Sequence, residues 1–280
     1  MDVTIIDQML ARYPADHASQ ELALREVMQE IALAGLYRGG FFDRAAFYGG
    51  TCLRIFYGLP RFSEDLAFSL LGPEPDFSLD PYFRALRDEF AAFGFEISLQ
   101  AKHKRIDSDI ELAFLKKTSS LYDLRITGRK AVKIKLEVDK DPPLAFSTDE
   151  RLLIQPYSFY TKCFALPDLF AGKMHALLFR KWKNRVKGRD WFDFEWYVRQ
   201  GHPLNLNHLA ERARQSGDLS DRSLSREDFQ RLLGDRIDSL NVKSAREDVT
   251  RFVPDPKKLE IWSREYFRQL AAMIQFADAR

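Results

Sequence analysis

The sequence has few cysteines, no long apolar run and no excess of one charge. Its two cysteines, Cys52 and Cys163, are far apart in the 280-residue chain, which excludes a disulfide framework and a cysteine-rich zinc site. No stretch approaches the roughly 18 consecutive apolar residues of a membrane span. The N-terminus also lacks the basic and then apolar pattern of a signal peptide. We therefore expect a cytoplasmic protein that does not enter a membrane.

The charges nearly cancel, with 43 Lys and Arg against 41 Asp and Glu. Global charge therefore does not predict a nucleic-acid partner, and any such binding has to come from local basic patches. The five histidines form no cluster with metal-ligand spacing. A chain of this length can bury one large core or two smaller ones.

The first half of the sequence mixes helical and strand-like patterns. Apolar residues recur at helical spacing over 19–40 and 80–95, and the second of these segments has Asp80 as a plausible N-cap before Pro81. Strand-like runs follow at 95–104, 110–117 and 131–140. Because helices and strands do not alternate regularly, the pattern favours an α+β domain.

The second half is helical in character. Helical patterns cover 166–183, 189–200, 225–240 and 257–280. We place the change of character near residues 155–165. The expected domains are an α+β domain over 1–160 and a helical bundle over 161–280.

The stretch "YGGTCLR" places two glycines before a predicted helix. Gly49 and Gly50 allow backbone N–H groups to approach a ligand, and the positive end of the helix would favour an anion. Thr51 adds a hydroxyl, which could equally be an N-cap. Taken alone, the stretch is also compatible with an ordinary turn.

The following stretch "RFSEDLAF" reads as an extended strand. Ser63, Asp65 and Ala67 would then share one face, because residues i and i+2 of a strand point the same way. Two carboxylates so spaced can hold divalent metal ions for phosphoryl transfer, but here the second position is alanine. A further carboxylate, Glu137, lies between apolar residues in "KIKLEV", which also fits an edge strand with a solvated polar face.

A predicted helix carries Lys173 and Arg180 on one face, seven residues apart. The lysine could aim at an anion or extend along apolar neighbours to solvent. Asp190 and Asp193 then begin the next helix, where helix capping explains Asp193. Between the two helices lies a basic segment with an interleaved tryptophan, either an RNA contact or a solvated loop. Its cations are Arg180, Lys181, Lys183, Arg185, Lys187 and Arg189.

These motifs together resemble the AbiEii/AbiGii toxin-type nucleotidyltransferases, within the DNA polymerase β-like superfamily. The resemblance rests on the Gly-Gly-Thr turn, "YGLPRFSEDL", "KIKLEV" and "AGKMHALLFRKWKNRVKGRDWFDFEWYV", in that order, from about residue 21 to residue 198. It implies a nucleotidyltransferase-fold mixed sheet with flanking helices. It also implies magnesium-dependent transfer from an NTP to RNA, with the 3′ end of tRNA as the acceptor of some members, and a cognate antitoxin as partner.

The resemblance also assigns roles to residues. Gly49, Gly50 and Thr51 would hold the triphosphate. Arg61 and Ser63 would contact phosphates, and Asp65 and Glu137 would bind metal, with Glu137 also placed to activate the attacking hydroxyl. Lys173 would neutralise the triphosphate, and Asp190 would complete the essential set. The place of Asp190 directly after Arg189 also suits it to orient Lys173 or a phosphate-binding arginine.

One position departs from the family pattern Ser-Glu-Asp-x-Asp, because Ala67 replaces the final aspartate. The loss of that carboxylate would severely weaken transfer. The alanine fits a site-directed inactive variant better than natural decay, since the other motif positions are intact. Three functions remain open: a nucleotidyltransferase toxin acting on RNA, a degenerate nucleotide- or RNA-binding module, and a transferase that modifies proteins.

Overall fold

The computed structural model describes residues 4–14, 17–102, 119–127, 131–180, 186–220 and 223–278. The chain forms two compact units. Unit 1 comprises residues 1–58, 62–142 and 148–163, and unit 2 comprises residues 59–61, 143–147 and 164–280. Two short segments, 59–61 with Arg61 and 143–147, therefore belong to the helical unit although unit 1 surrounds them in the sequence.

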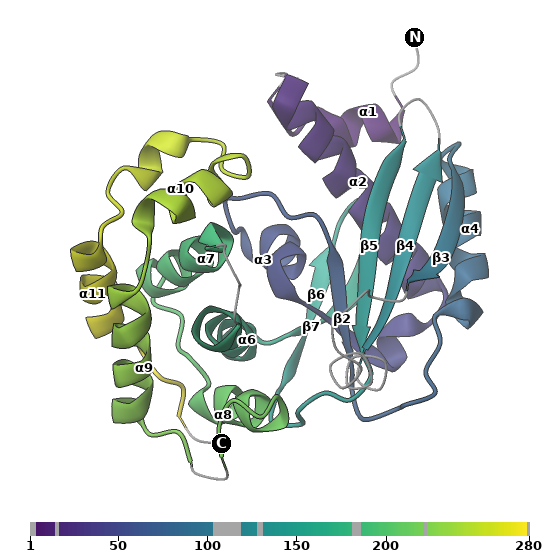
Figure 1. Ribbon diagram of the computed structural model, residues 1–280. Coiled ribbons are helices and arrows are strands. Elements are labelled where there is room, and N and C mark those ends of the chain that lie inside the picture. Colours follow the sequence, from purple (N-terminus) through teal and green to yellow (C-terminus); the bar gives the residue numbers. More distant parts are fainter. Residues whose placement is uncertain are drawn as a thin grey trace. The chain divides into compact units, whose positions relative to one another are not determined.

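A seven-stranded mixed sheet forms the centre of unit 1 (Figure 1). The strand order is β3-β4-β5-β2-β1-β7-β6. The pairs β1–β2, β3–β4 and β4–β5 are antiparallel, whereas β2–β5 and β1–β7 are parallel. The strands are β1 (Ala45–Tyr48), β2 (Leu66–Leu70), β3 (Glu96–Lys102), β4 (Ser119–Thr127), β5 (Val132–Asp139), β6 (Thr148–Leu153) and β7 (Phe159–Phe164).

The helices of unit 1 pack on this sheet. The long helix α2 lies along α4 and against β5, while α3 packs on β1 and β2. Leu66 and Phe68 on β2 and Leu136 on β5 are fully buried, because alternate residues of these strands face the core. The helical elements are α1 (Ile5–Leu10), α2 (His17–Arg38), η1 (Phe41–Asp43), α3 (Gly49–Tyr57), η2 (Asp80–Tyr82) and α4 (Phe83–Ala92).

Unit 2 is helical and is built around α6 and α7. The rings of Phe170 on α6 and Tyr197 on α7 stack with centroids 4.2 Å apart. The C-terminal segment is held by Leu204, whose amide donates to the carbonyl of Gln275 and whose carbonyl accepts from the amide of Ala277. Its helices are α6 (Leu166–Phe179), α7 (Gly188–Arg199), α8 (Leu206–Gln215), α9 (Arg226–Asp238), α10 (Val242–Thr250), η3 (Pro256–Leu259) and α11 (Arg264–Ala272).

The α+β class and the mixed sheet are confirmed, but several local predictions were wrong. Leu79, not Asp80, is the N-cap of the element that begins the segment 80–95. The expected helix over 257–280 is two elements, because Ser263 caps a new helix, α11. Helices α8 and α10 were not predicted, and the expected strand at 110–117 lies outside the described residues.

Within the described residues, no helix is both long enough and apolar enough to cross a membrane.

Gly188 allows α7 to begin in close contact with α10. A Cβ atom at this position would lie 1.8 Å from the carbonyl oxygen of Ala245, which is backbone and cannot move aside as a side chain would. We expect Gly188→Ala to destabilise the chain by about 1–3 kcal/mol through overpacking, measured as the free energy of unfolding in urea. Gly234→Ala on α9 is the control, since its Cβ would meet nothing within 4 Å. An equal loss in both variants would contradict the steric explanation.

Candidate active site

The N-terminus of α3 forms one side of the candidate site in unit 1. Strand β1 ends at Tyr48, and Gly49 then adopts φ +82°, which allows the helix to start directly after the strand. The first amide groups of a helix have no partner within the helix, so they point outward with the positive end of the helix dipole. Gly49 and Gly50 therefore occupy positions suited to an anionic ligand.

Position 67 lies directly against this helix start. Ala67 is the register partner of Tyr48 on β1 and of Glu137 on β5. A Cβ atom built on Gly49 would lie 3.4 Å from the Cβ of Ala67. A side chain at position 67 is therefore flanked on one side by the end of β1 and the N-terminus of α3, and on the other side by Glu137 of β5.

The segment before β2 is held by two hydrogen bonds to its backbone. The Thr51 hydroxyl donates to the carbonyl oxygen of Asp65 at 2.5 Å, and Gln29 Nε2 donates to the carbonyl of Ser63 at 3.2 Å. Both donors are buried. The Thr51 hydroxyl proton is thus used to position Asp65. The expected contact of Thr51 with a triphosphate stays a prediction. Gln29 was not singled out in the sequence, because its partner is 34 residues away.

Asp65 itself is exposed and lies one residue before β2, which begins at Leu66. The expected strand over the whole of "RFSEDLAF" is therefore shorter than predicted. The preceding residue, Glu64, forms an ion pair with Arg25 of α2 at 3.3 Å. This contact directs Glu64 to α2.

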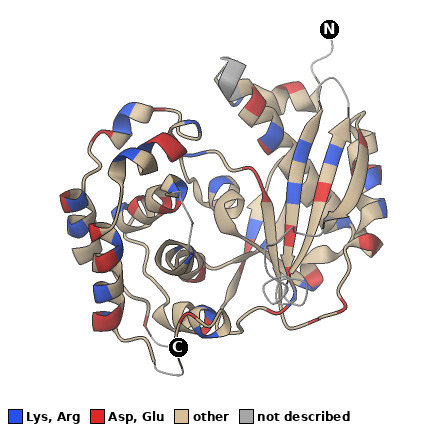
Figure 2. Ribbon diagram, viewed as in Figure 1, with Lys and Arg blue, Asp and Glu red and all other residues tan. Residues whose placement is uncertain are grey.

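Glu137 lies on the polar face of β5. Ile134, Leu136 and Val138 are buried, and the intervening residues are half-buried or exposed, which confirms the predicted alternation. Glu137 forms an ion pair with Lys135 at 2.9 Å, and its side chain remains 29% exposed. Figure 2 shows the basic and acidic bands along β5. Glu137 is accessible to a ligand yet electrostatically paired.

The donor set of unit 1 does not fit a divalent metal ion well. Mg²⁺ is usually held by carboxylates together with substrate phosphates. The described residues include no group of three His, Cys, Asp or Glu side chains that could hold a metal. Of the predicted metal ligands Asp65 and Glu137, the second is paired with a lysine, and the methyl group of Ala67 lies beside it in the sheet.

Unit 2 contains a buried ionic trio, formed by Arg61, Lys173 and Asp193. The Asp193 carboxylate accepts hydrogen bonds from Arg61 Nε and Nη2, both at 2.6 Å, and Lys173 Nζ lies 2.6 Å from Asp193 Oδ2. Asp193 is fully buried and Arg61 is 2% exposed. Burial opposes the charged carboxylate, but the two cations outweigh it and lower the pKa of Asp193.

The trio bears on three roles predicted from the sequence. Arg61 forms a buried two-point contact with Asp193, whereas the sequence suggested a phosphate contact. Asp193 contacts Lys173, and it is not the helix cap that the sequence suggested, since α7 begins at Gly188 with Lys187 as its N-cap. The orienting role expected of Asp190 stays a prediction. The signal for Asp193 was its position between Phe192 and Phe194, both buried in α7.

Asp190 lies near Lys187, and the basic segment contributes further charge. Burial lowers the pKa of Lys187 to about 8, Asp190 opposes this shift, and Arg180, Arg189 and Lys173 add to it. Arg180 is exposed, and Arg189 lies over the ring of Phe252 with its Cζ 4.2 Å from the ring centroid. The predicted RNA contacts Lys181, Lys183 and Arg185 lie outside the described residues.

The predicted site residues thus fall into two groups. Unit 1 holds Gly49, Gly50, Thr51, Ser63, Asp65, Ala67 and Glu137, and unit 2 holds Arg61, Lys173, Asp190 and the described basic residues. Within unit 1, β1, β2, β5 and α3 bring position 67 and Glu137 together. Within unit 2, α6 and α7 bring Lys173 to Asp193.

A family model described as "Nucleotidyl transferase AbiEii toxin, Type IV TA system" matches residues 31–277. Among solved structures, the chain is similar to MenT4, a nucleotidyltransferase toxin from Mycobacterium tuberculosis H37Rv, with a TM-score of 0.58 and 17% identity over 100% of this chain and 91% of that one. JHP933 from Helicobacter pylori is similar with a TM-score of 0.53 and 19% identity, covering 91% of this chain and 90% of that one. At this identity the two structures support the fold. No curated protein matches.

The Thr51 hydroxyl positions the backbone of Asp65, so its removal should loosen that segment. We expect Thr51→Val to cost about 1 kcal/mol and to speed amide hydrogen exchange in residues 62–66. Thr161→Val is the control, because the Thr161 hydroxyl on β7 is buried without a partner among the described residues. Unchanged exchange at 62–66 in Thr51→Val would contradict the positioning role.

The depressed pKa of Asp193 makes the trio sensitive to acid. Because the folded pKa lies below the unfolded value of about 3.9, this stabilisation is present above that pH and is lost as the pH falls through the folded pKa. At pH 7, Asp193→Asn should cost about 3–5 kcal/mol, since it leaves two cations without their buried partner.

The difference in unfolding free energy between the parent and Asp193→Asn should narrow as the pH falls below about 4. The measurement is urea unfolding at several pH values. Asp238→Asn is the control, because its ion pair with Arg268 is about half exposed on both sides and should contribute little. A pH-independent difference would show that Asp193 does not act through its charge.

Proposed function

Because this chain belongs to the AbiEii family of nucleotidyltransferase toxins of type IV toxin–antitoxin systems, we propose that it is built to transfer a nucleoside monophosphate from an NTP to RNA. The proposed acceptor is the 3′ end of tRNA, and its modification would block translation. The observation that carries the proposal is the placement of position 67 between the N-terminus of α3 and Glu137. The family implies an antitoxin as partner.

The chemistry follows from that placement. The amides at the start of α3 would bind triphosphate oxygens. A hydroxyl of the acceptor would attack the α-phosphorus and form the new P–O bond. The bond between the α-phosphorus and the bridging oxygen would break, and pyrophosphate would leave with the electron pair. Glu137 is the candidate to receive the hydroxyl proton, with Asp65 close in sequence to position 67 on the same segment.

The resemblance to the family gives Lys173 of unit 2 the role of neutralising triphosphate charge. Its contact with the buried Asp193 holds the ammonium group in one place, so little reorganisation is needed when the substrate binds. Arg61 supports the same carboxylate from the other side. Arg61 is therefore proposed as a positioning residue, and Lys173 as the group that meets the substrate.

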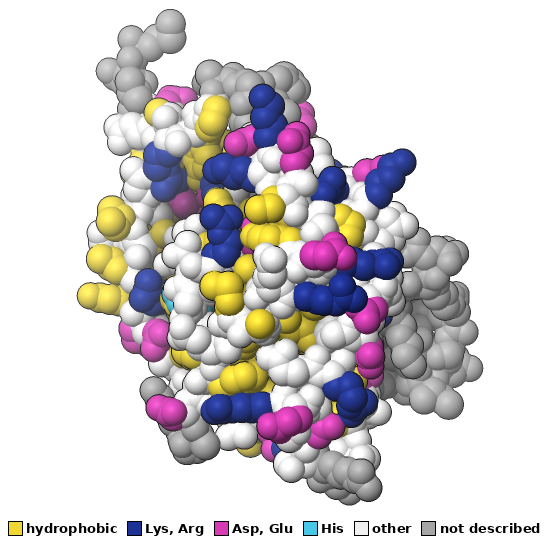
Figure 3. Space-filling model, turned by 90° about the vertical axis from the view of Figure 1, so that its left-hand side faces the viewer, with side chains coloured by type: hydrophobic (Ala, Val, Ile, Leu, Met, Phe, Trp, Pro, Cys, Tyr) yellow, Lys and Arg dark blue, Asp and Glu magenta, His cyan; other side chains and the backbone are white. Residues whose placement is uncertain are grey.

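The basic residues near α7 are the proposed RNA contacts. In the described part, Arg180 at the end of α6 and Lys187 and Arg189 at the start of α7 contribute three cations. On the face drawn in Figure 3, the coloured Lys and Arg side chains are interspersed with Asp and Glu. RNA binding would therefore rely on this local group, and it should weaken strongly with added salt.

Ala67 is the reason to expect weak transfer by this chain. An aspartate here would add a third carboxylate beside Glu137, and magnesium bound by such a set would neutralise phosphate charge. The alanine is proposed to impair the enzyme, and it favours one alternative function, a degenerate module that binds nucleotide or RNA. That alternative predicts binding without transfer even when the carboxylate is restored.

The decisive comparison is between this chain and its Ala67→Asp variant. Each would be incubated with magnesium, total tRNA and one labelled NTP at a time. We expect transfer by Ala67→Asp to exceed that of the parent by at least about 100-fold, equivalent to about 2.7 kcal/mol of barrier. An Ala67→Asn variant of similar size, which lacks the charge, is the control and should stay near the parent level.

Labelled RNA only with Ala67→Asp would establish both the RNA acceptor and the missing carboxylate. No labelling by either form would contradict transfer to tRNA. The same assay with protein acceptors would then test for a protein-modifying enzyme.

A further inference from the structure

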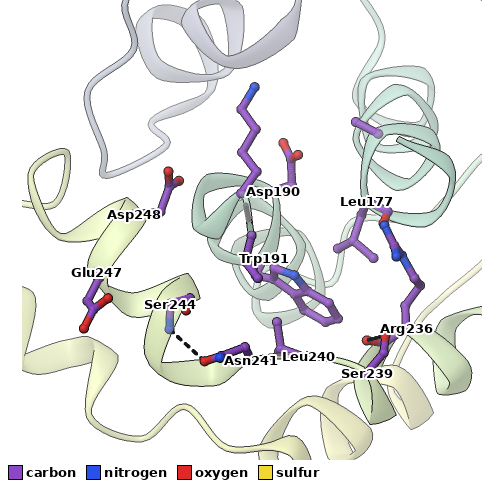
Figure 4. A pocket seen from close by; sticks show the side chains of 13 residues that line it. Leu177, Asp190, Trp191, Arg236, Ser239, Leu240, Asn241, Ser244, Glu247 and Asp248 are labelled. Atoms are coloured by element: carbon purple, nitrogen blue, oxygen red, sulfur yellow. Dashed lines mark hydrogen bonds between the residues drawn. The ribbon is translucent and has the colours of Figure 1, made fainter. Parts of the chain in front are cut away.

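A cavity of about 740 Å³ lies within unit 2, outside the trio of Arg61, Lys173 and Asp193. We call it the Trp191 cavity. It is lined by residues of α6, α7 and α10 and by the end of α9, and Figure 4 shows the Trp191 indole near Leu177 and Leu240. Its volume is within the range of about 300–1,000 Å³ typical of small-molecule sites.

One wall of the cavity is apolar. Leu177 and Leu240 are buried side chains, and Trp191 is 6% exposed, so the wall presents aliphatic groups and part of an indole ring. Such a wall suits a flat ring that loses its hydration on binding. The wall is stabilised from behind, because the indole packs on Phe267 with ring centroids 4.8 Å apart.

Oxygen acceptors line the cavity from α7, next to Trp191, and from α10. The carboxylates of Asp190, Glu247 and Asp248 line the cavity, and in Figure 4 Glu247 and Asp248 project from the same helix. Asp248 accepts a hydrogen bond from the amide of Gly188 at 3.0 Å. Ionised carboxylate oxygens only accept hydrogen bonds, so these three carboxylates would recognise a ring that carries N–H donors.

A cation completes the set. Lys187 lines the cavity, and its electrostatic neighbours include Arg180, Arg189 and Lys173, with Asp190 opposing them. Asp190 is the strongest charged neighbour of Lys187, but three cations act on it as well, and their combined positive charge favours an anion nearby. The cavity therefore combines an apolar wall, acceptors for ring N–H groups and a place for one anionic group.

A planar ring with amino donors, joined to a phosphate, is a nucleotide. We infer that the Trp191 cavity binds a nucleoside monophosphate unit, with a base bearing an exocyclic amine against Trp191 and Glu247, and the phosphate at Lys187. Cytosine, adenine and guanine satisfy this requirement, whereas uracil has no exocyclic amine. The source of the unit, the donor NTP or the terminal nucleotide of the RNA acceptor, rests on the proposed function.

The test fills the cavity without changing the rest of unit 2. Ser244 lines the cavity from α10, and its backbone amide is capped by Asn241 at 3.0 Å, a contact that Ser244→Phe retains. Lys243→Phe adds the same side chain at an exposed position of α10 that does not line the cavity. Calorimetry on the full chain would measure the affinities for CMP, UMP, CTP and a trinucleotide ending in cytidine.

We expect CMP to bind at least about 10-fold more tightly than UMP, which corresponds to about 1.4 kcal/mol. Ser244→Phe should bind CMP more weakly than the parent by at least this factor, while Lys243→Phe should bind CMP as tightly as the parent. Glu247→Gln, at an exposed position where folding is not at risk, should reduce the preference for CMP over UMP. Tighter binding of CTP than of the trinucleotide would identify the donor as the source, and the reverse order would identify the RNA end.

Equal affinity in the parent and in a folded Ser244→Phe chain would overturn the inference, as would the absence of nucleotide binding. The result is separable from the proposed function. If Ser244→Phe, added to Ala67→Asp, leaves transfer unchanged, the assignment of the cavity is wrong and the proposed transferase function stands. If Ser244→Phe loses nucleotide binding and no form transfers a nucleotide, the nucleotide site in the cavity is supported and the proposed transferase function is wrong.

Discussion

The helical unit depends on one buried carboxylate. Asp193 has no exposed surface and meets two cations at 2.6 Å. A buried charge without partners is costly, so Arg61, Lys173 and Asp193 must be present together. This requirement joins residue 61, from a short segment early in the chain, to helices α6 and α7 of unit 2. It also gives Lys173 a fixed position, which a surface lysine would not have.

The sheet imposes a comparable constraint on unit 1. The parallel register of β2 and β5 sets Ala67 beside Glu137, and the antiparallel register with β1 sets it beside Tyr48. A shift of one residue would turn position 67 to the core, because side chains alternate along a strand. Thr51 and Gln29 then hold the segment that carries Asp65 through its backbone carbonyls. Buried hydrogen bonds thus place the chemical groups that the substrate would meet.

Family membership and local chemistry contribute different parts of the account. The family match covers residues 31–277 and gives the class of enzyme and its toxin–antitoxin context. The solved structures, at 17% and 19% identity, support the fold. Neither decides what an alanine at position 67 does. That question depends on the groups around this side chain, namely the start of α3 and a glutamate paired with Lys135.

The sequence by itself determined the α+β class, the polar and apolar faces of β5, most of the long helices and the motif order. These features are local, since they depend on periodicities of two or 3.6 residues and on glycine at a turn. Only the tertiary structure decided that Asp193, and not Asp190, meets Arg61 and Lys173, and that Thr51 binds the carbonyl of Asp65. The same holds for the Trp191 cavity. These contacts join residues far apart in the chain, and no local pattern encodes which of two nearby aspartates will face a buried cation.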